Sequence, residues 1–437
     1  MSGAFLWLAA STGLLSLLTP CVFPMVPVTI AYFSAPQGDA SRAIRRPLLF
    51  GLGIVGTFTL LGLALAAIFG AAGLNRFASD PWVNLALAVM FLLFAANLFG
   101  WLATPVPWRI VNAADRAARE VTPGSSFGAL LMGATFTLTS VTCTAPFVGT
   151  LLVLASRGSW AMPVIGMLVY STAFAFPFVL LAMLPRSVAK LPRAGRWMQT
   201  LRVMIGVLEV GAAIKFVSNA DLVMGWGVFT RELVLIFWAA LAVAAGLYLA
   251  RGVRQGARRH QGIVGASISA GVALLFAGWL LSGVNGRVLP QIEAFLPPVA
   301  PAFATTSRGS LPVSWMLNDF AGSLGVARST GKLVFVDFTG YTCTNCRWME
   351  ANIFSRPDVS AELGNFVLSR LYTDGEGEMY EKQQAFQEAT FGTVALPLYA
   401  VIGADGKARA TFSGLTRNPA EFIAFLQGAQ AAKVASR

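Results

Sequence analysis

The stretch KLVFVDFTGYTCTNCRWMEANIF, residues 332–354, decides the fold of the C-terminal part of the chain. KLVFVDF is a short apolar run with branched and aromatic side chains, which predicts a buried strand. TCTNCRWMEANIF predicts a helix that opens at Cys343 and Cys346. A Cys-x-x-Cys motif at a strand-to-helix turn is typical of redox domains, so this stretch predicts thiol–disulfide chemistry.

The residues that follow continue the same alternation of strands and helices. NFVLSRLY predicts a strand, EMYEKQQAFQEATF a helix, and LPLYAVI with ARATFSG a hairpin closed by the turn ADGK. NPAEFIAFLQGAQ predicts a closing helix with Asn418 as its cap and Pro419 at its first position. The order strand, helix, strand, helix, hairpin, helix predicts an α+β domain over residues 311–437.

A Cys-x-x-Cys motif can also be half of a zinc site. The chain has four cysteines and one histidine, and that histidine, His260, lies in a predicted cytoplasmic loop. No further ligands are present to complete a tetrahedral site. We therefore expect redox chemistry and no metal.

The N-terminal two thirds of the chain have the composition of a membrane domain. The whole chain is 56% hydrophobic and 12% charged, about half the charged fraction of a soluble protein. The first apolar block lacks a basic start and a cleavage site, so it is interpreted as a span and not as a signal peptide. Apolar blocks long enough to cross a bilayer predict eight spans, at residues 5–33, 48–72, 82–102, 127–155, 160–184, 201–217, 233–250 and 263–281.

The basic residues of the connecting loops predict the orientation. From Ser310 onward there are 11 of the 32 Lys and Arg and 12 of the 20 Asp and Glu, so the net charge of +12 belongs to the apolar part. The odd-numbered loops carry 14 basic residues and the even-numbered loops three. By the positive-inside rule the odd loops are cytoplasmic, and both termini lie outside. With no long basic run and no nucleic-acid motif, this charge predicts topology and no nucleic-acid partner.

A segment rich in Pro, Ala and Ser, LPQIEAFLPPVAPAFATTSRGSLP from Leu289, separates the two parts. It predicts an extended linker that is not packed. The predicted organisation is therefore a membrane domain over 1–285, a linker over 286–310 and the α+β domain over 311–437.

The two remaining cysteines share one motif in the apolar part. LTPCVFP places Cys21 three residues before Pro24, and VTCTAPF places Cys143 three residues before Pro146. These motifs lie in the first and fourth spans, which run in opposite directions, and predict an inverted repeat of three spans with two further spans appended. The prolines disfavour a continuous helix and leave carbonyl groups that must face protein or water. The alternative is that the cysteines are small apolar residues in ordinary spans.

Two charged residues, Glu209 and Lys215, lie within the sixth predicted span. Charge inside a membrane is costly and marks a functional site by default. Lys215 can extend toward the outer interface, whereas Glu209 is expected to support proton movement or a polar cavity. Six residues apart, the two do not face each other on a helix.

Several details beyond the Cys-x-x-Cys motif resemble one family. Asp337 lies six residues before Cys343, as in thioredoxins, and Pro397 in ALPLY occupies the position of the cis-proline that faces the thioredoxin disulfide. Glu350, four residues after Cys346, and NIFSRPDV after it resemble the C-terminal domain of DsbD-type transmembrane thiol reductases. LTPCVFP, TCTAPF and GVLEVGAAIKFVSNADL resemble the membrane domain of that family.

The resemblance implies a relay of reducing equivalents without a prosthetic group. Cytoplasmic thioredoxin would reduce a Cys21–Cys143 disulfide, and the membrane pair would then reduce Cys343–Cys346. The outer domain would reduce periplasmic proteins such as disulfide isomerases and apocytochromes, from a multi-pass protein of the bacterial inner membrane. Family members carry an N-terminal extramembrane domain, which is expected to be absent or a separate polypeptide.

The resemblance also assigns roles to the residues around the outer pair. Cys343, at a helix N-terminus, is the expected exposed nucleophile, and Cys346 the buried resolving thiol. Asp337 and Glu350 would raise the pKa of these thiols by adding negative charge. Two alternatives stay open: an oxidase that passes electrons to quinone, and a solute or metal transporter with a fused thioredoxin domain.

Overall fold

The computed structural model describes residues 3–18, 22, 33, 40–101, 127–138, 140, 161–183, 196–257, 263–298 and 315–435. The four membrane residues Cys21, Pro24, Cys143 and Pro146 lie outside these ranges. The chain divides into two compact units, Met1–Leu74 with Met90–Val210, and Asn75–Val89 with Gly211–Arg437.

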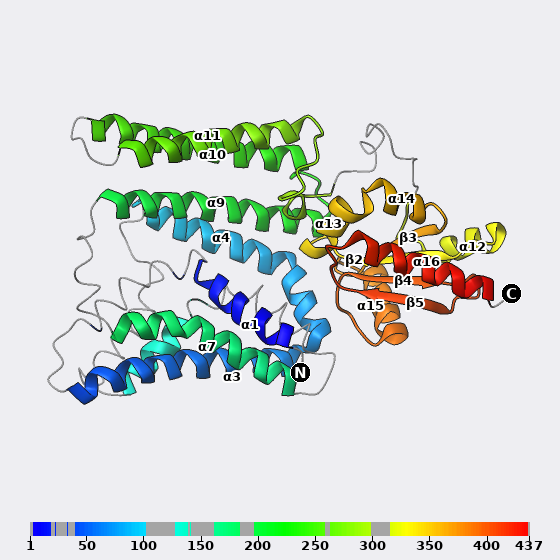
Figure 1. The fold of residues 1–437 in the computed structure, drawn as a ribbon, viewed down its shortest axis with the longest axis horizontal. Helices are drawn as coiled ribbons and strands as arrows, with labels where there is room; N and C mark the ends of the chain where they lie inside the picture. Colours follow the sequence, from blue (N-terminus) through cyan, green and yellow to red (C-terminus); the bar gives the residue numbers. More distant parts are fainter. Residues whose placement is uncertain are drawn as a thin grey trace. The chain divides into compact units, whose positions relative to one another are not determined.

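The described residues of the apolar part lie mostly in helices, joined by short turns (Figure 1). Among the described residues, five helices are long and apolar enough to cross a membrane. They lie within α3 (Ala40–Ser79), α4 (Pro81–Leu98), α7 (Ala161–Met183), α10 (Arg231–Ala257) and α11 (Ile263–Val284), and Phe5–Leu15 and Phe127–Leu138 are shorter apolar helices. Every predicted span thus coincides at least partly with a helix, but the count of eight remains a prediction. The sixth span lies in α9, which is long but carries Glu209 and Lys215 in its middle. The labelled elements are α1 (Gly3–Leu15), η1 (Ser16–Leu18), α3 (Ala40–Ser79), α4 (Pro81–Leu98), α7 (Ala161–Met183), α9 (Arg196–Met224), α10 (Arg231–Ala257) and α11 (Ile263–Val284).

Glycines allow the helices of the first unit to cross closely. Gly13 of α1 lies against the main chain of Tyr170 in α7, and Gly53 of α3 lies against Gly133 in the helix Phe127–Leu138. A side chain at either crossing would overlap backbone atoms, as is typical of tightly packed membrane helices. The first predicted span therefore packs on the fifth and the second on the fourth. In the predicted repeat, spans one, two and three correspond to spans four, five and six. The contact between spans one and five therefore corresponds to the contact between spans four and two, which agrees with an inverted repeat.

Helices α10 and α11 form an antiparallel hairpin in the second unit (Figure 1). A buried ion pair closes its end: Arg231 Nε lies 2.6 Å from Glu293 Oε1, and Nη2 of the same guanidinium lies 3.0 Å from Oε2. Arg231 also donates to the carbonyl groups of Gly283 and Arg287. Glu293 lies in η2 (Glu293–Phe295), and Leu289 and Leu296 beside it are buried against the hairpin.

The start of the predicted linker is therefore packed and not extended. Its Pro-rich composition suits an open chain, but Leu289 and Leu296 bury apolar surface and Glu293 pairs with Arg231. The later part of the segment, residues 299–314, lies outside the described residues.

The C-terminal domain is built on one five-stranded sheet with the order β1-β3-β2-β4-β5. Strands β1, β3 and β2 are parallel, whereas β4 runs antiparallel to β2 and β5 antiparallel to β4. The elements are β1 (Trp315–Leu317), α12 (Phe320–Thr330), β2 (Val334–Thr339), α13 (Thr344–Met349), η4 (Glu350–Phe354), α14 (Pro357–Leu363), β3 (Val367–Tyr372), α15 (Glu378–Phe391), β4 (Leu398–Ile402), β5 (Ala408–Ser413) and α16 (Pro419–Ala435).

The alternation of side chains along β2 assigns each residue to one face of the sheet. Val334, Val336 and Phe338 pack with residues of α12 and α15 on one face. Phe335 packs on the other face with residues of α13, η4, α14 and α16. Asp337 lies two residues after Phe335 in β2, so its side chain points to the same face of the sheet, which is the face that carries the cysteine helix.

The predicted order of elements in this domain is confirmed. The closing helix begins at Pro419, and Asn418 Oδ1 accepts from the Ala420 amide at 3.1 Å, as a cap does. The prediction missed β1 and α12, which precede the quoted stretch. The predicted cysteine helix is also divided, since α13 continues as a π-helical turn and α14 restarts at Pro357.

The Arg231–Glu293 pair predicts how the hairpin end opens. Arg231→Gln leaves the Glu293 carboxylate buried without its counter-ion, which costs about 3 kcal/mol or more. We expect trypsin to cut the intact, detergent-solubilised variant after Arg287 faster than it cuts the parent, in which Arg231 binds the Arg287 carbonyl. Arg356→Gln, at an exposed pair, is the control. Equal resistance of Arg231→Gln and the parent would contradict this role.

Candidate active site around Cys343 and Cys346

Cys343 and Cys346 form a disulfide at the start of α13, with Cα atoms 5.3 Å apart. Cys343 is the N-cap residue, and its sulfur accepts a hydrogen bond from the Cys346 amide at 3.2 Å. The N-terminus of a helix favours negative charge on such a sulfur. Cys343 is half-buried, whereas Cys346 is 1% exposed. Of the two sulfurs of this disulfide, that of Cys343 is therefore the one accessible to a partner protein.

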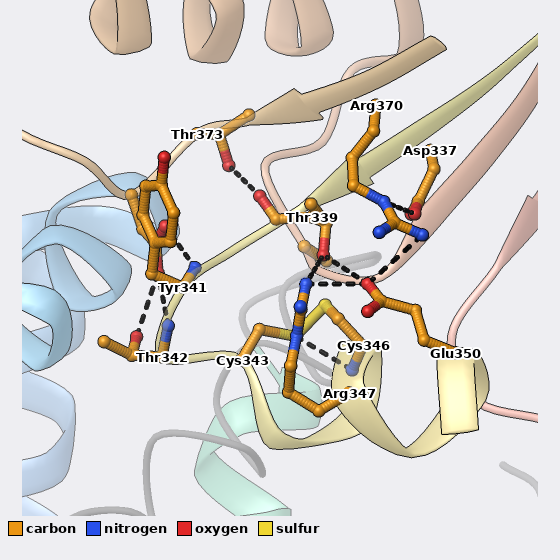
Figure 2. The surroundings of a disulfide bond; sticks show 12 residues. Asp337, Thr339, Tyr341, Thr342, Cys343, Cys346, Arg347, Glu350, Arg370 and Thr373 are labelled. Atoms are coloured by element: carbon orange, nitrogen blue, oxygen red, sulfur yellow. Dashed lines mark hydrogen bonds and ion pairs between the residues drawn. A yellow bond between two sulfur atoms is a disulfide. The ribbon is translucent and has the colours of Figure 1, made fainter. Parts of the chain in front are cut away.

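Four charged side chains gather on one side of this disulfide (Figure 2). Arg370 Nε lies 2.9 Å from Asp337 Oδ2, and Arg347 Nη2 lies 2.6 Å from Glu350 Oε1. Arg370 Nη2 lies 3.6 Å from the same Glu350 oxygen and links the two pairs. Thr339 accepts from Arg347 at 3.0 Å and completes the network.

Asp337 is 1% exposed, and its other carboxylate oxygen has no partner among the described residues. Burial raises its pKa to about 6, the nearby charge of Glu350 acts in the same direction, and Arg370 and Arg347 oppose both. As the pH rises through about 6, Asp337 therefore gains a negative charge near the disulfide.

Asp374 holds the loop that precedes Cys343. Its buried carboxylate accepts from the Tyr341 amide at 2.7 Å and from the amide and hydroxyl of Thr342 at 2.9 and 3.0 Å. Burial raises the pKa of Asp374 above its usual value, although the hydrogen bonds from Thr342 and Tyr341 oppose this rise. The Tyr341 ring also stacks on Tyr372, with centroids 4.0 Å apart. These contacts determine the position of the backbone that presents Cys343.

The structure brings together some of the residues expected at the site. Asp337, Glu350 and the two cysteines lie in one group, and the peptide bond between Leu396 and Pro397 is cis. Glu209 lies in α9, fully buried, and neither of its carboxylate oxygens has a partner among the described residues. Cys21, Pro24, Cys143 and Pro146 are outside those residues.

Sequence reasoning missed Arg347, Arg370 and Asp374. A signal existed for Arg370, which is the one charged residue in the apolar strand NFVLSRLY. A charge in a buried strand requires a partner. Arg347 directly follows Cys346, on the side of the helix that faces the interior, whereas Asp374 has no distinguishing pattern.

This arrangement is suited to thiol–disulfide exchange. An accessible sulfur at a helix N-terminus can form a mixed disulfide, and the buried sulfur three residues later can resolve it. The reaction moves two electrons and needs no other group. We expect the charged network behind the sulfurs to influence how readily the thiols ionise.

Two family models match the chain. Residues 3–220 match the Cytochrome C biogenesis protein transmembrane domain, and residues 315–404 match a thioredoxin-like domain. The two matches lie in the two parts predicted from the sequence.

Curated relatives match across both parts. The chain is 29% identical over 372 residues to the thiol:disulfide interchange protein DsbD 1 of Pseudomonas aeruginosa, covering 82% of this chain and 59% of the relative. It is 27% identical over 401 residues to the thiol:disulfide interchange protein DsbD of Vibrio vulnificus, covering 89% of this chain and 62% of the relative. The chain thus spans about three fifths of the length of these relatives.

The titration of Asp337 predicts the pH profile of Cys343. In the reduced, intact protein, alkylation of Cys343 should accelerate with pH, flatten near pH 6 as Asp337 ionises, and then accelerate again. Asp337→Asn should remove the flat region and lower the pKa of the Cys343 thiol by about one unit, a tenfold faster alkylation at pH 7. Glu350→Gln should act in the same direction. The rates are measured with iodoacetamide and mass spectrometry.

Asp405→Asn is the control, because Asp405 pairs with Arg409 at an exposed site and the same charge is removed. It should leave the profile of Cys343 unchanged. Identical profiles for the parent, Asp337→Asn and Glu350→Gln would exclude both carboxylates from the chemistry.

Proposed function

We propose that this chain is a DsbD-type protein and that it carries reducing equivalents across the bacterial inner membrane by thiol–disulfide exchange. Cytoplasmic thioredoxin donates two electrons to the Cys21–Cys143 disulfide. The reduced membrane pair then attacks the Cys343–Cys346 disulfide. In each step a thiolate forms a mixed disulfide, the second cysteine of the donor pair resolves it, and the acceptor leaves as a dithiol.

The observation that carries this proposal is the disulfide at the start of α13, with one accessible and one buried sulfur. It occurs in a thioredoxin-like domain that follows a membrane domain of the matching family. The reciprocal helix crossings of the first unit support an inverted repeat. Such repeats allow alternating access, which the membrane pair needs because it meets a partner at each face.

The acceptors we propose are periplasmic thiol–disulfide proteins. Disulfide isomerases, apocytochromes and a separate N-terminal domain of the DsbD type all present a disulfide that Cys343 can attack. Reduction of these proteins would support disulfide isomerisation and cytochrome c maturation. The oxidase and transporter alternatives are not favoured, because the relatives that match both parts are thiol:disulfide interchange proteins.

Loss of one membrane cysteine tests the relay. Cys21→Ser or Cys143→Ser should leave the Cys343–Cys346 pair oxidised in cells, because electrons no longer reach it from the cytoplasm. Acid quenching followed by alkylation with a mass-tagged maleimide reports the redox state. Conservative replacement of Ser11, a hydroxyl residue of α1, by Ala is the control. A pair as reduced in the cysteine variants as in the parent would refute the relay.

The proposed orientation places both termini and the thioredoxin-like domain in the periplasm. In a variant with Ser at all four native cysteines, Arg193→Cys should react only with reagents that enter the cytoplasm. Ser307→Cys should react with a membrane-impermeant maleimide added to intact spheroplasts, because the positive-inside rule places it outside. Protection of Ser307→Cys in spheroplasts, with labelling only after lysis, would overturn this orientation.

A further inference from the structure

Arg370 lies between the two carboxylates that approach the disulfide. It is in β3, directly opposite Asp337 of β2 in the parallel register. Its guanidinium contacts Asp337 at 2.9 Å and Glu350 at 3.6 Å. The other side of the guanidinium lies over the Trp315 ring, with its carbon 4.2 Å from the centroid. An aromatic ring on one side and two carboxylates on the other hold this side chain, which is 14% exposed.

Arg347 adds a second buried positive charge to the same group. Its side chain is 4% exposed and contacts Glu350 and Thr339. Its Nε and Nη1 atoms have no partner among the described residues. The group therefore holds two carboxylates and two guanidinium ions, and its net charge is zero when both acids are ionised.

We propose that Arg370 is a positioning residue of the exchange site, because its positive charge partly offsets the rise that the carboxylates cause in the pKa of Cys343. Its role rests on the proposed function, since it concerns the thiols that carry the electrons. The acids alone would favour the uncharged thiol. With Arg370 in place, the reactivity of Cys343 depends on the net charge of the two carboxylates and two guanidinium ions.

If this net charge sets the pKa of Cys343, loss of an acid and loss of Arg370 must shift that pKa in opposite directions. Loss of Asp337 leaves an excess positive charge, which lowers the pKa of the Cys343 thiol. Loss of Arg370 leaves an excess negative charge, which raises it. Loss of both restores a net charge of zero and returns the thiol to the parent value. A residue that only supports the fold has no reason to produce opposite shifts that cancel.

The pKa of Asp337 determines the pH range in which the effect of Arg370 on Cys343 is measured. With Arg370 in place this pKa is about 6, because burial raises it more than Arg370 lowers it. Without Arg370 the carboxyl ionises at a higher pH. The excess negative charge in Arg370→Gln is therefore present only above the raised pKa of Asp337. For this reason the titration of Cys343 is followed up to pH 11.

The experiment uses the intact, detergent-solubilised chain with Ser at the two membrane cysteines, so that only Cys343 and Cys346 react. Iodoacetamide rates against pH, resolved by tandem mass spectrometry, give the pKa of Cys343. We expect a rise of about one unit in Arg370→Gln, a tenfold loss of thiolate below the pKa, and a fall of about one unit in Asp337→Asn. The double variant should match the parent, and Arg370→Lys should restore most of the parent value.

Arg356→Gln removes the same charge from the exposed pair with Asp358 and is the matched control. An unchanged or lowered pKa in folded Arg370→Gln would overturn the proposal. If Arg370→Gln does not fold, the double variant compared with Asp337→Asn decides, because the double variant removes Asp337 together with Arg370 and Glu350 keeps its ion pair with Arg347. A double variant that keeps the low pKa of Asp337→Asn would also overturn it.

Failure of this inference is distinguishable from failure of the proposed function. The titration uses no electron donor or acceptor, so it reports only the charge around Cys343. The relay is tested in cells by the redox state of the Cys343–Cys346 pair in Cys21→Ser. A correct relay with an unshifted titration would refute the role of Arg370 alone.

Discussion

The burial of Asp337 beside the disulfide is the constraint on which the arrangement of this domain depends. A carboxylate in the interior of a sheet is costly unless a counter-ion lies within reach. Arg370 on the neighbouring strand meets this need, and the parallel register of β2 and β3 places the two residues opposite each other. Glu350 and Arg347 extend the pair into a four-membered group along the cysteine helix.

The rest of the site follows from the need to present one sulfur and hide the other. The start of α13 exposes Cys343 and buries Cys346 one turn later. Asp374 holds the backbone just before Cys343 through three hydrogen bonds. In the proposed exchange reaction, the hydrogen-bonded loop would set the position of the attacking thiol, and the adjacent charged group would set its acidity.

The membrane part applies a different principle, since packing there depends on small residues. Gly13 and Gly53 allow the first span to approach the fifth and the second to approach the fourth. The hairpin of α10 and α11 relies instead on a buried ion pair, Arg231–Glu293, at its end. This pair also holds the start of the segment that leads to the C-terminal domain.

The sequence by itself determined the helical membrane part, the order of elements after Lys332 and the place of Cys343 and Cys346 at a strand-to-helix turn. These depend on local patterns: long apolar runs, the strand-to-helix turn and the spacing of two cysteines. Only the tertiary structure decided that Arg370 pairs with Asp337, that Asp374 holds Thr342 and that Leu289 and Leu296 are packed. Each of these contacts joins residues from different elements, and no pattern along one segment specifies which partner across the fold a charged or apolar side chain will meet.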